Sequence, residues 1–232
     1  MTEKTSSGNK IIDELLGGGL NKHELNMVYG EAATGKTTLC LMFAIEMASK
    51  GKKTIFLDSE NGFSIERLNQ LKGIDISKII ENIFVIKLKD FEDQKEKIEK
   101  LKDIVKKGNF EGVVLDTIGY HYRNALKSAP YRVNKEADNQ FRVLKDLAMN
   151  GVCILITNQV YANFKEKNDV EMVGGKMFRN WSNVLVKIKK ENENERCALL
   201  LKPIKKENKK LKGEYIVPSI KFKIKERGFI PL

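Results

Sequence analysis

Eight consecutive residues have the types and spacing needed to bind an oligophosphate. They are Gly30, Glu31, Ala32, Ala33, Thr34, Gly35, Lys36 and Thr37. Glycines let the backbone curl closely around an anion, and the neighbouring amides then point inward as hydrogen-bond donors. In this pattern the lysine reaches the β- and γ-phosphates, and the threonine hydroxyl binds Mg²⁺. We therefore expect a nucleoside triphosphate with Mg²⁺ at residues 30–37, with Thr38 beside them.

The flanking residues predict a strand before this loop and a helix after it. The run from Leu25 to Tyr29 is typical of a buried strand, and Thr38–Lys50 of a helix. This order places bound phosphates at the N-terminus of a helix, where backbone amides are free to donate. The alternative, a glycine-rich turn that binds nothing, does not account for the flanking strand and helix.

Three polar residues follow other predicted strands and could complete a hydrolytic site. Asp116 ends an apolar strand and is placed to fix Mg²⁺, whereas Glu60 and Gln159 come just after two further strands. Ligands of open α/β sheets bind at the carboxyl ends of the strands, which is where these side chains should meet. Each also has a plainer interpretation, as a turn cap, an exposed loop residue and a loop-capping amide respectively.

The rest of the chain predicts one α/β domain over residues 1–232. The expected strands are 53–58, 83–88, 112–116, 152–157, 183–190, 196–203 and 215–224, and the expected helices are 11–16, 64–72, 91–107 and 133–150. Continuous apolar strands that alternate with helices indicate a mostly parallel sheet covered on both faces. After residue 183 the strands follow one another without helices, which predicts an antiparallel C-terminal extension of the same sheet.

Composition excludes several classes of protein. No apolar run approaches the roughly 18 residues that a membrane span needs, and the N-terminus lacks the apolar segment of a signal peptide. We therefore expect a cytoplasmic protein without membrane contact. The cysteines Cys40, Cys153 and Cys197 lie far apart in apolar stretches, which indicates inert buried thiols rather than a metal site.

The net charge of +11 is concentrated in the C-terminal quarter. Residues 176–232 contain 16 lysines and arginines against six acidic residues. Such asymmetry suggests a surface that faces a polyanion. Lysine enrichment is also common in hyperthermophile proteins. Charge alone therefore does not distinguish a polyanion-binding surface from a thermophilic composition.

Two segments combine aromatic and basic residues in a way that suits contact with DNA. One is the segment after Asp116, and the other runs from Val160 to Gly174. Aromatic rings can stack on bases while basic side chains contact phosphates. The candidate DNA contacts are Tyr122, Arg123, Arg132, Lys165 and Lys167. Both segments could instead be solvated connections, although we expect irregular functional loops because of their length.

Taken together, these motifs resemble those of RecA-superfamily ATPases, and most closely an archaeal recombinase paralogue. The segments that carry the resemblance read GEAATGKTTLC, LDSENGFSIERL, VVLDT and ITNQVY, and a Gly174-Gly175 pair is followed by Trp181-Ser182. They occur in the family's order and span nearly the whole chain. The phosphate-binding loop alone would fit many nucleotide-binding families, whereas the set is much more specific.

The resemblance implies a role for each residue of the site and a set of cofactors and partners. Glu60 matches the glutamate that activates the attacking water, and Asp116 matches the Walker B aspartate. Gln159 matches the glutamine that couples the nucleotide to the second DNA-binding loop, and Arg67 an arginine that stacks on adenine. The implied cofactors are ATP and Mg²⁺. The implied partners are single-stranded or branched DNA, the main archaeal recombinase RadA, a Holliday-junction resolvase and a second copy of the chain.

Departures from the family pattern weaken the expectation of strand exchange. The resembling core begins almost at Met1, so we expect no preceding helical DNA-binding domain, and the polymerisation linker has no evident counterpart. The second loop, between Gln159 and Gly174, is short. We therefore expect an ATP-binding, weakly hydrolytic, DNA-binding accessory protein of homologous recombination and DNA repair.

Two other functions share this core. A KaiC-like signalling ATPase resembles it but carries paired catalytic glutamates, and Ser59-Glu60 is not such a pair. The other alternative is a binding module that ATP stabilises without meaningful turnover.

Overall fold

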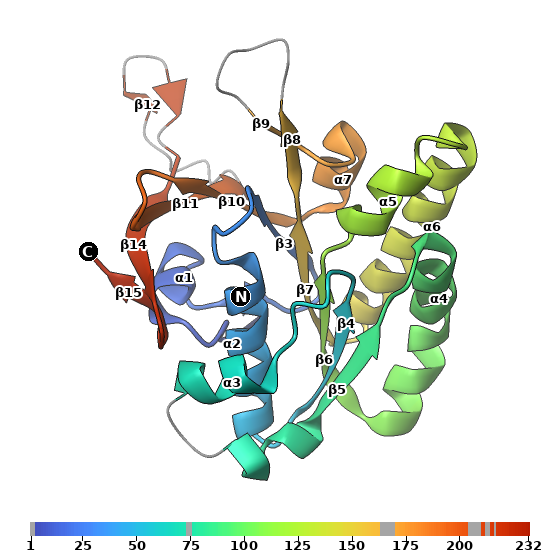
Figure 1. Ribbon diagram of the computed structural model, residues 1–232, viewed down its shortest axis with the longest axis horizontal. Coiled ribbons are helices and arrows are strands. Elements are labelled where there is room, and N and C mark those ends of the chain that lie inside the picture. Colours follow the sequence, from blue (N-terminus) through green and yellow to red (C-terminus); the bar gives the residue numbers. More distant parts are fainter. Residues whose placement is uncertain (1–2, 73–75, 163–169, 204–209, 212–213, 216) are drawn as a thin grey trace.

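The computed structural model describes residues 3–72, 76–162, 170–203, 210–211, 214–215 and 217–232. A nine-stranded sheet forms its centre (Figure 1). Its strands are β3 (Leu25–Gly30), β4 (Lys53–Asp58), β5 (Ile83–Lys87), β6 (Phe110–Asp116), β7 (Cys153–Asn158), β10 (Val184–Lys190), β11 (Glu195–Lys202), β14 (Ser219–Lys225) and β15 (Gly228–Pro231). Their order across the sheet is β15-β14-β11-β10-β3-β7-β6-β4-β5.

The sheet has a parallel part and an antiparallel part, as the sequence predicts. Strands β5, β4, β6, β7, β3 and β10 run parallel to their neighbours. Strands β10, β11, β14 and β15 then pair antiparallel. The predicted fold class, a RecA-like α/β core with an antiparallel C-terminal extension, is confirmed.

Helices cover the two faces of the sheet. They are α1 (Lys10–Leu15), α2 (Lys36–Ser49), α3 (Ile65–Lys72), α4 (Phe91–Gly108), α5 (Gly119–Ala125), α6 (Pro130–Met149) and α7 (Gly175–Trp181), with 3₁₀ turns at Ile76–Lys78 and Ile80–Asn82. Helices α1, α2 and α3 share one apolar core with the sheet, and α4 to α7 share the core of the opposite face (Figure 1). Short strand pairs are β1 (Lys4–Thr5) with β2 (Leu20–Asn21), β8 (Val160–Ala162) with β9 (Val170–Met172), and β12 (Lys210–Leu211) with β13 (Glu214–Tyr215).

Local sequence explains where the long helices begin and end. Helix α4 starts after Asp90, whose carboxylate accepts a hydrogen bond from the Asp93 amide, and it ends at Asn109 in the left-handed conformation. Helix α6 starts at Pro130, whose fixed φ and missing amide suit the first helical position. Burying an apolar side chain such as Phe141 stabilises the fold by about 1.5–3 kcal/mol.

The segment after Asp116 is not the irregular loop that we predicted. It forms α5 and then α6, which begins three residues earlier than expected because Pro130 initiates it. The expected irregular segment from Val160 to Gly174 contains the strand pair β8–β9, followed by α7. Helix α7 and strand β15 were not predicted, because such short elements show too little periodicity to be recognised.

Within the described residues, no helix is both long and apolar enough to span a bilayer.

Candidate nucleotide site

The phosphate-binding loop connects the end of β3 to the start of α2. Strand β10 and the β14–β15 hairpin confine it. A Cβ atom on Gly30 would lie 2.3 Å from the carbonyl oxygen of Ile188 in β10. Gly35 has φ +97°, and a Cβ there would lie 2.8 Å from both Ile224 Cδ1 and Phe229 Cε1. Both glycines are therefore needed, because the sheet leaves no room for a side chain at either position.

Arg196 of β11 fixes the tip of this loop. Its Nε and Nη2 donate hydrogen bonds of 3.3 and 3.2 Å to the carbonyl oxygen of Ala33. Its Nη1 donates to the carbonyl oxygens of Asn192 and Glu193 in the turn between β10 and β11. Ala33 has φ 59°, a conformation that costs a residue with a side chain about 1–2 kcal/mol. Sequence analysis missed Arg196, because no local motif marks it.

Lys36 is folded back onto the loop that carries it. Its Nζ donates hydrogen bonds of 2.9 and 2.7 Å to the carbonyl oxygens of Gly30 and Glu31. Burial lowers the pKa of Lys36, and the nearby carboxylates of Asp116 and Glu60 oppose that effect by favouring the charged ammonium. Three of the predicted site residues therefore lie within electrostatic reach of one another.

Asp116 supplies a buried carboxylate at the end of β6. One of its oxygens, Oδ1, accepts a hydrogen bond from the Thr157 hydroxyl. The other, Oδ2, is buried and accepts no hydrogen bond of ordinary geometry within the described part of the chain. Burial raises the pKa of Asp116, while the hydroxyls of Thr157 and Thr37 lower it. An orphaned carboxylate oxygen near a threonine hydroxyl fits Mg²⁺, which prefers oxygen ligands.

Glu60 is presented by a loop that wraps around a second buried carboxylate. Asp58, which is 1% exposed, accepts hydrogen bonds from the backbone amides of Glu60, Gly62 and Phe63 at 3.2, 3.0 and 3.0 Å. Glu60 itself is exposed, and its Oε1 accepts a 2.8 Å hydrogen bond from the Thr117 hydroxyl. Asp58 thus positions the loop that carries Glu60. Sequence analysis assigned it no role, although an aspartate that ends an apolar strand is a recognisable signal.

Gln159 lies where the sheet meets the β8–β9 ribbon. In the parallel pairing of β3 with β7, Asn158 is opposite Tyr29, so that Gln159 follows beside the start of the phosphate-binding loop. The Gln159 amide donates to Asn158 Oδ1 at 2.9 Å, and its carbonyl accepts from the Val173 amide at 3.0 Å. Its backbone is therefore fixed between the strand end and the ribbon.

Arg67 lies on α3, against the turn between β14 and β15. Its guanidinium donates to the carbonyl oxygens of Glu226 and Lys225 at 3.1 and 3.4 Å, and to Gln70 Oε1 at 3.0 Å. A cavity of about 300 Å³ adjoins the start of α2, and its lining comprises Ala33, Gly35, Lys36, Thr37, Thr38 and Ile224. The C-terminal hairpin thus forms a wall of the nucleotide site, which the sequence did not indicate.

The structure describes three of the five candidate DNA contacts. Tyr122 is 4% exposed, packs against Phe178 and donates a 2.7 Å hydrogen bond to Asn134 Oδ1, so the prediction that it stacks on DNA is wrong. Arg123 is exposed on α5, and Arg132 is exposed on α6 but is paired with Glu92 at 2.5 Å. The predicted contacts Lys165 and Lys167 lie outside the described residues.

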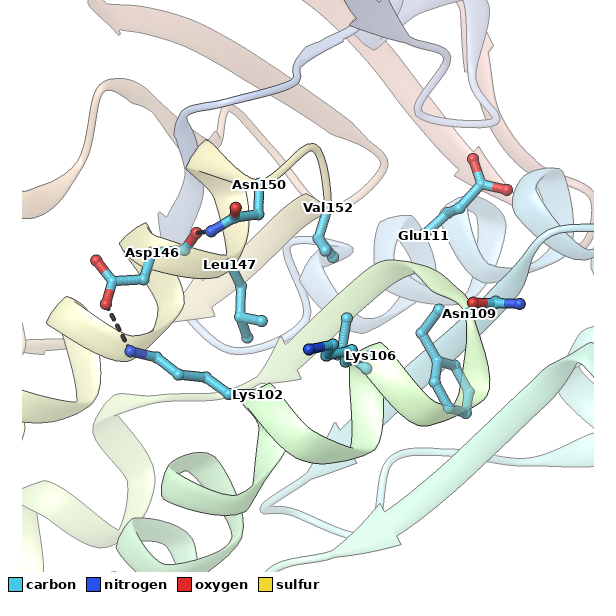
Figure 2. A pocket seen from close by; sticks show the side chains of 10 residues that line it. Lys102, Lys106, Asn109, Glu111, Asp146, Leu147, Asn150 and Val152 are labelled. Carbon is cyan, nitrogen blue, oxygen red and sulfur yellow. Dashed lines mark hydrogen bonds and ion pairs between the residues drawn. The ribbon is translucent and has the colours of Figure 1, made fainter.

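Another cavity in the described part of the chain lies away from the nucleotide site. Figure 2 shows this space of about 740 Å³ between the C-terminal ends of α4 and α6, at the amino ends of β6 and β7. Lys102 and Asp146 form an ion pair of 2.6 Å across it, while Val105, Leu147 and Val152 contribute apolar lining. This cavity lies at the amino ends of the strands, whereas Lys36 and Asp116 lie at their carboxyl ends. It therefore takes no part in phosphate chemistry.

The contact between Gly35 and the C-terminal hairpin predicts that a side chain at position 35 destabilises the fold, whereas a substitution at position 33 of the same loop does not. We expect Gly35→Ala to lower the free energy of unfolding by about 2–5 kcal/mol through backbone strain and overpacking, and to abolish nucleotide binding. The control Ala33→Gly relieves a strained φ and should leave stability unchanged or slightly higher. Thermal unfolding and binding of a fluorescent nucleotide measure both variants. Equal stability of wild type and Gly35→Ala would contradict the packing described.

Comparison with known proteins assigns the family. The Rad51 family model matches residues 2–211. The chain is 34% identical to the DNA repair and recombination protein RadB of Methanosphaera stadtmanae, over 96% of this chain and 94% of that protein. The RadB protein of Methanobrevibacter smithii is also 34% identical, over 97% and 94% of the two chains. That of Thermococcus sibiricus is 37% identical over 69% and 70%. The chain therefore belongs to the RadB family of archaeal proteins within the RecA superfamily.

Proposed function

We propose that this protein binds ATP with Mg²⁺, hydrolyses it slowly, and acts on DNA as an accessory to homologous recombination and repair in the cytoplasm. The observation that carries the proposal is the meeting of Lys36, Asp116 and Glu60 at the carboxyl ends of three strands. Burial lowers the pKa of Lys36 and raises the pKa of Asp116, and the carboxylates of Asp116 and Glu60 favour the charged form of Lys36. The relatives' names as DNA repair and recombination proteins support the biological role.

Each residue of the site has a proposed role that follows from its chemistry. The amides of residues 30–37 and the Lys36 ammonium bind the phosphates. Thr37 and Asp116 hold Mg²⁺, which neutralises phosphate charge when it is bound. Ile224 lines the cavity, and Arg67 bonds the carbonyl oxygens of the residues that follow it, so we propose that the base extends to this side and stacks on the Arg67 plane.

Glu60 is our proposed base for the attacking water. We expect Glu60→Gln to lower the hydrolysis rate by about 100- to 10,000-fold while nucleotide affinity changes little, because the proposed role of Glu60 is to accept a proton from water rather than to bind the phosphates or the base. Phosphate release and nucleotide binding are measured side by side, with Glu99→Gln, an exposed glutamate on α4, as the control. If wild type and Glu60→Gln both show background turnover while DNA binding persists, the protein is a nucleotide-stabilised binding module rather than an ATPase.

Gln159 is our proposed link between the nucleotide and DNA. Its backbone is fixed beside the start of the phosphate-binding loop and the β8–β9 ribbon, so a γ-phosphate contact by its side chain would bias the order of the following segment. Coupling of this kind changes an affinity by about 5- to 150-fold. We expect Gln159→Ala to remove the effect of ATP on DNA affinity, while Asn139→Ala, an exposed amide on α6, keeps it. Unchanged sensitivity to ATP in Gln159→Ala would overturn the proposed link.

The exposed edge of β5 is the surface that best suits a protein partner. Within the described part of the sheet β5 pairs with β4 alone, and its Phe84 and Val85 are 42% and 37% exposed. An unpaired edge with apolar side chains favours the addition of a strand from another chain. We propose that RadA, a second copy of this protein or a Holliday-junction resolvase docks there.

Substitution of Phe84 tests this docking surface. Buried aromatic anchors usually dominate an interface, so Phe84→Ser should weaken binding of purified RadA by about tenfold or more. Tyr131→Ser, which removes an 86% exposed aromatic on α6, is the matched control. Sedimentation of each variant reports self-association in parallel. Equal RadA affinity and equal self-association of the two variants would exclude the β5 edge.

A further inference from the structure

The antiparallel extension of the sheet has one face that lines the core beside α1 and α2, and an opposite, outer face that reaches the second core only at Leu185 and Leu201 among its described residues. Ile188, Ala198 and Phe222 occupy neighbouring positions in β10, β11 and β14, and all three belong to the core beside α1 and α2. Because side chains alternate along a strand, the residues between them point to the opposite face. Strands β14, β11 and β10 lie side by side at the upper left of Figure 1, around α1.

Lysine dominates this outer face. The outward positions include five lysines and one glutamate, namely Lys187, Lys189, Lys221, Lys223, Lys225 and Glu195. A second acid, Glu191, lies in the adjoining turn. Lys189 and Lys221 are direct neighbours of Cys197 on its two sides. We call this set of lysines the basic sheet face.

The acids on the basic sheet face neutralise it only in part. Lys221 lies 3.5 Å from Glu191, and Lys223 lies 3.8 Å from Glu195, with lysine side chains that are 56% and 37% exposed. Exposed pairs of this kind contribute little free energy and exchange readily for another anion. Lys189 and Lys225 are exposed, and within the described residues no ion pair is recorded for either.

The close spacing of these lysines raises the electrostatic free energy of the folded protein unless an anion is bound. Alternate residues on a strand lie about 6.6–6.8 Å apart, so Lys221, Lys223 and Lys225 form a row of like charges along β14. Lysine is also depleted in strands, and like charges on neighbouring positions repel. A solvated sheet face needs polar residues, but it does not need residues of one sign.

We propose that the basic sheet face binds the phosphodiester backbone of DNA. The inference rests on the DNA-binding part of the proposed function and assigns that activity to a surface outside α5 and the 160–174 segment. Lysine acts as a point charge and carries little base specificity, whereas arginine is favoured for bidentate recognition. Among the outward residues of β10, β11 and β14 none is aromatic, which favours phosphate contact over base stacking.

The other side of the same strands connects the basic sheet face to the nucleotide site. Ile224 and Phe229 contact Gly35 from the β14–β15 hairpin, and Arg196 of β11 holds the Ala33 carbonyl. DNA bound to the outer face and a nucleotide bound on the inner face would therefore stabilise the same strands. Each ligand should strengthen the binding of the other.

The test compares two triple variants that change the net charge equally. The first, Lys221→Gln with Lys223→Gln and Lys225→Gln, removes the β14 row. The control, Lys100→Gln with Lys106→Gln and Lys107→Gln, removes exposed lysines of α4 for which no ion pair is recorded in the described residues. Fluorescence anisotropy with labelled oligo(dT) gives the affinity across a series of salt concentrations. Circular dichroism verifies folding, and the single variant Lys225→Gln, at the end of its strand, replaces the first triple variant if that one misfolds.

Loss of three phosphate contacts lowers the slope of log K against log salt by about 2 on single-stranded DNA, and affinity by about 100-fold at 0.1 M salt. We expect both changes in the β14 variant and neither in the α4 control. If wild type binds DNA and the β14 variant keeps its slope, the basic sheet face is excluded while the proposed function stands. If wild type does not bind oligo(dT) at low salt, the DNA-binding function itself fails. Loss of binding to poly-aspartate with DNA binding intact would assign the face to acidic proteins and overturn the proposal.

Discussion

The closeness of Gly35 to the C-terminal hairpin is the constraint on which the nucleotide site depends. Ile224 and Phe229 occupy the space that a side chain at position 35 would need, and Ile188 does the same at Gly30. Arg196 adds hydrogen bonds from β11 to the tip of the loop. The phosphate-binding loop is therefore shaped by strands that follow it by more than 150 positions, and its geometry depends on their order.

Electrostatics sets what this confined loop can bind. Lys36, Asp58 and Asp116 are all buried, and burial of charge is costly unless each group finds a partner. Asp58 satisfies its carboxylate with three backbone amides, and Lys36 uses two carbonyls of its own loop. Within the described residues, Asp116 keeps one oxygen that accepts no hydrogen bond of ordinary geometry. In the function that we propose, a Mg²⁺-nucleotide would supply a cation for Asp116 and phosphates in place of the loop carbonyls for Lys36.

The parts of the site that lie in contiguous motifs could be predicted from the sequence. So could the alternation of strands and helices, which brings these motifs together at the carboxyl ends of the strands. Asp116 and Glu60 could be placed there because parallel strands end on the same side of a sheet. Arg196 could not be found, since its contact with Ala33 joins residues 163 positions apart and leaves no local pattern. Tyr122 was misassigned for a related reason. Its neighbours in sequence are basic, but its neighbours in space are Phe91 and Phe178.

We propose that one set of strands links a slow ATPase site to DNA. The most direct measurement is steady-state ATP hydrolysis by the intact protein, with and without single-stranded DNA, at saturating Mg²⁺. We expect slow turnover that requires Mg²⁺ and changes when DNA is added. ATP binding and hydrolysis that DNA leaves unaltered, at DNA concentrations where binding is complete, would contradict it.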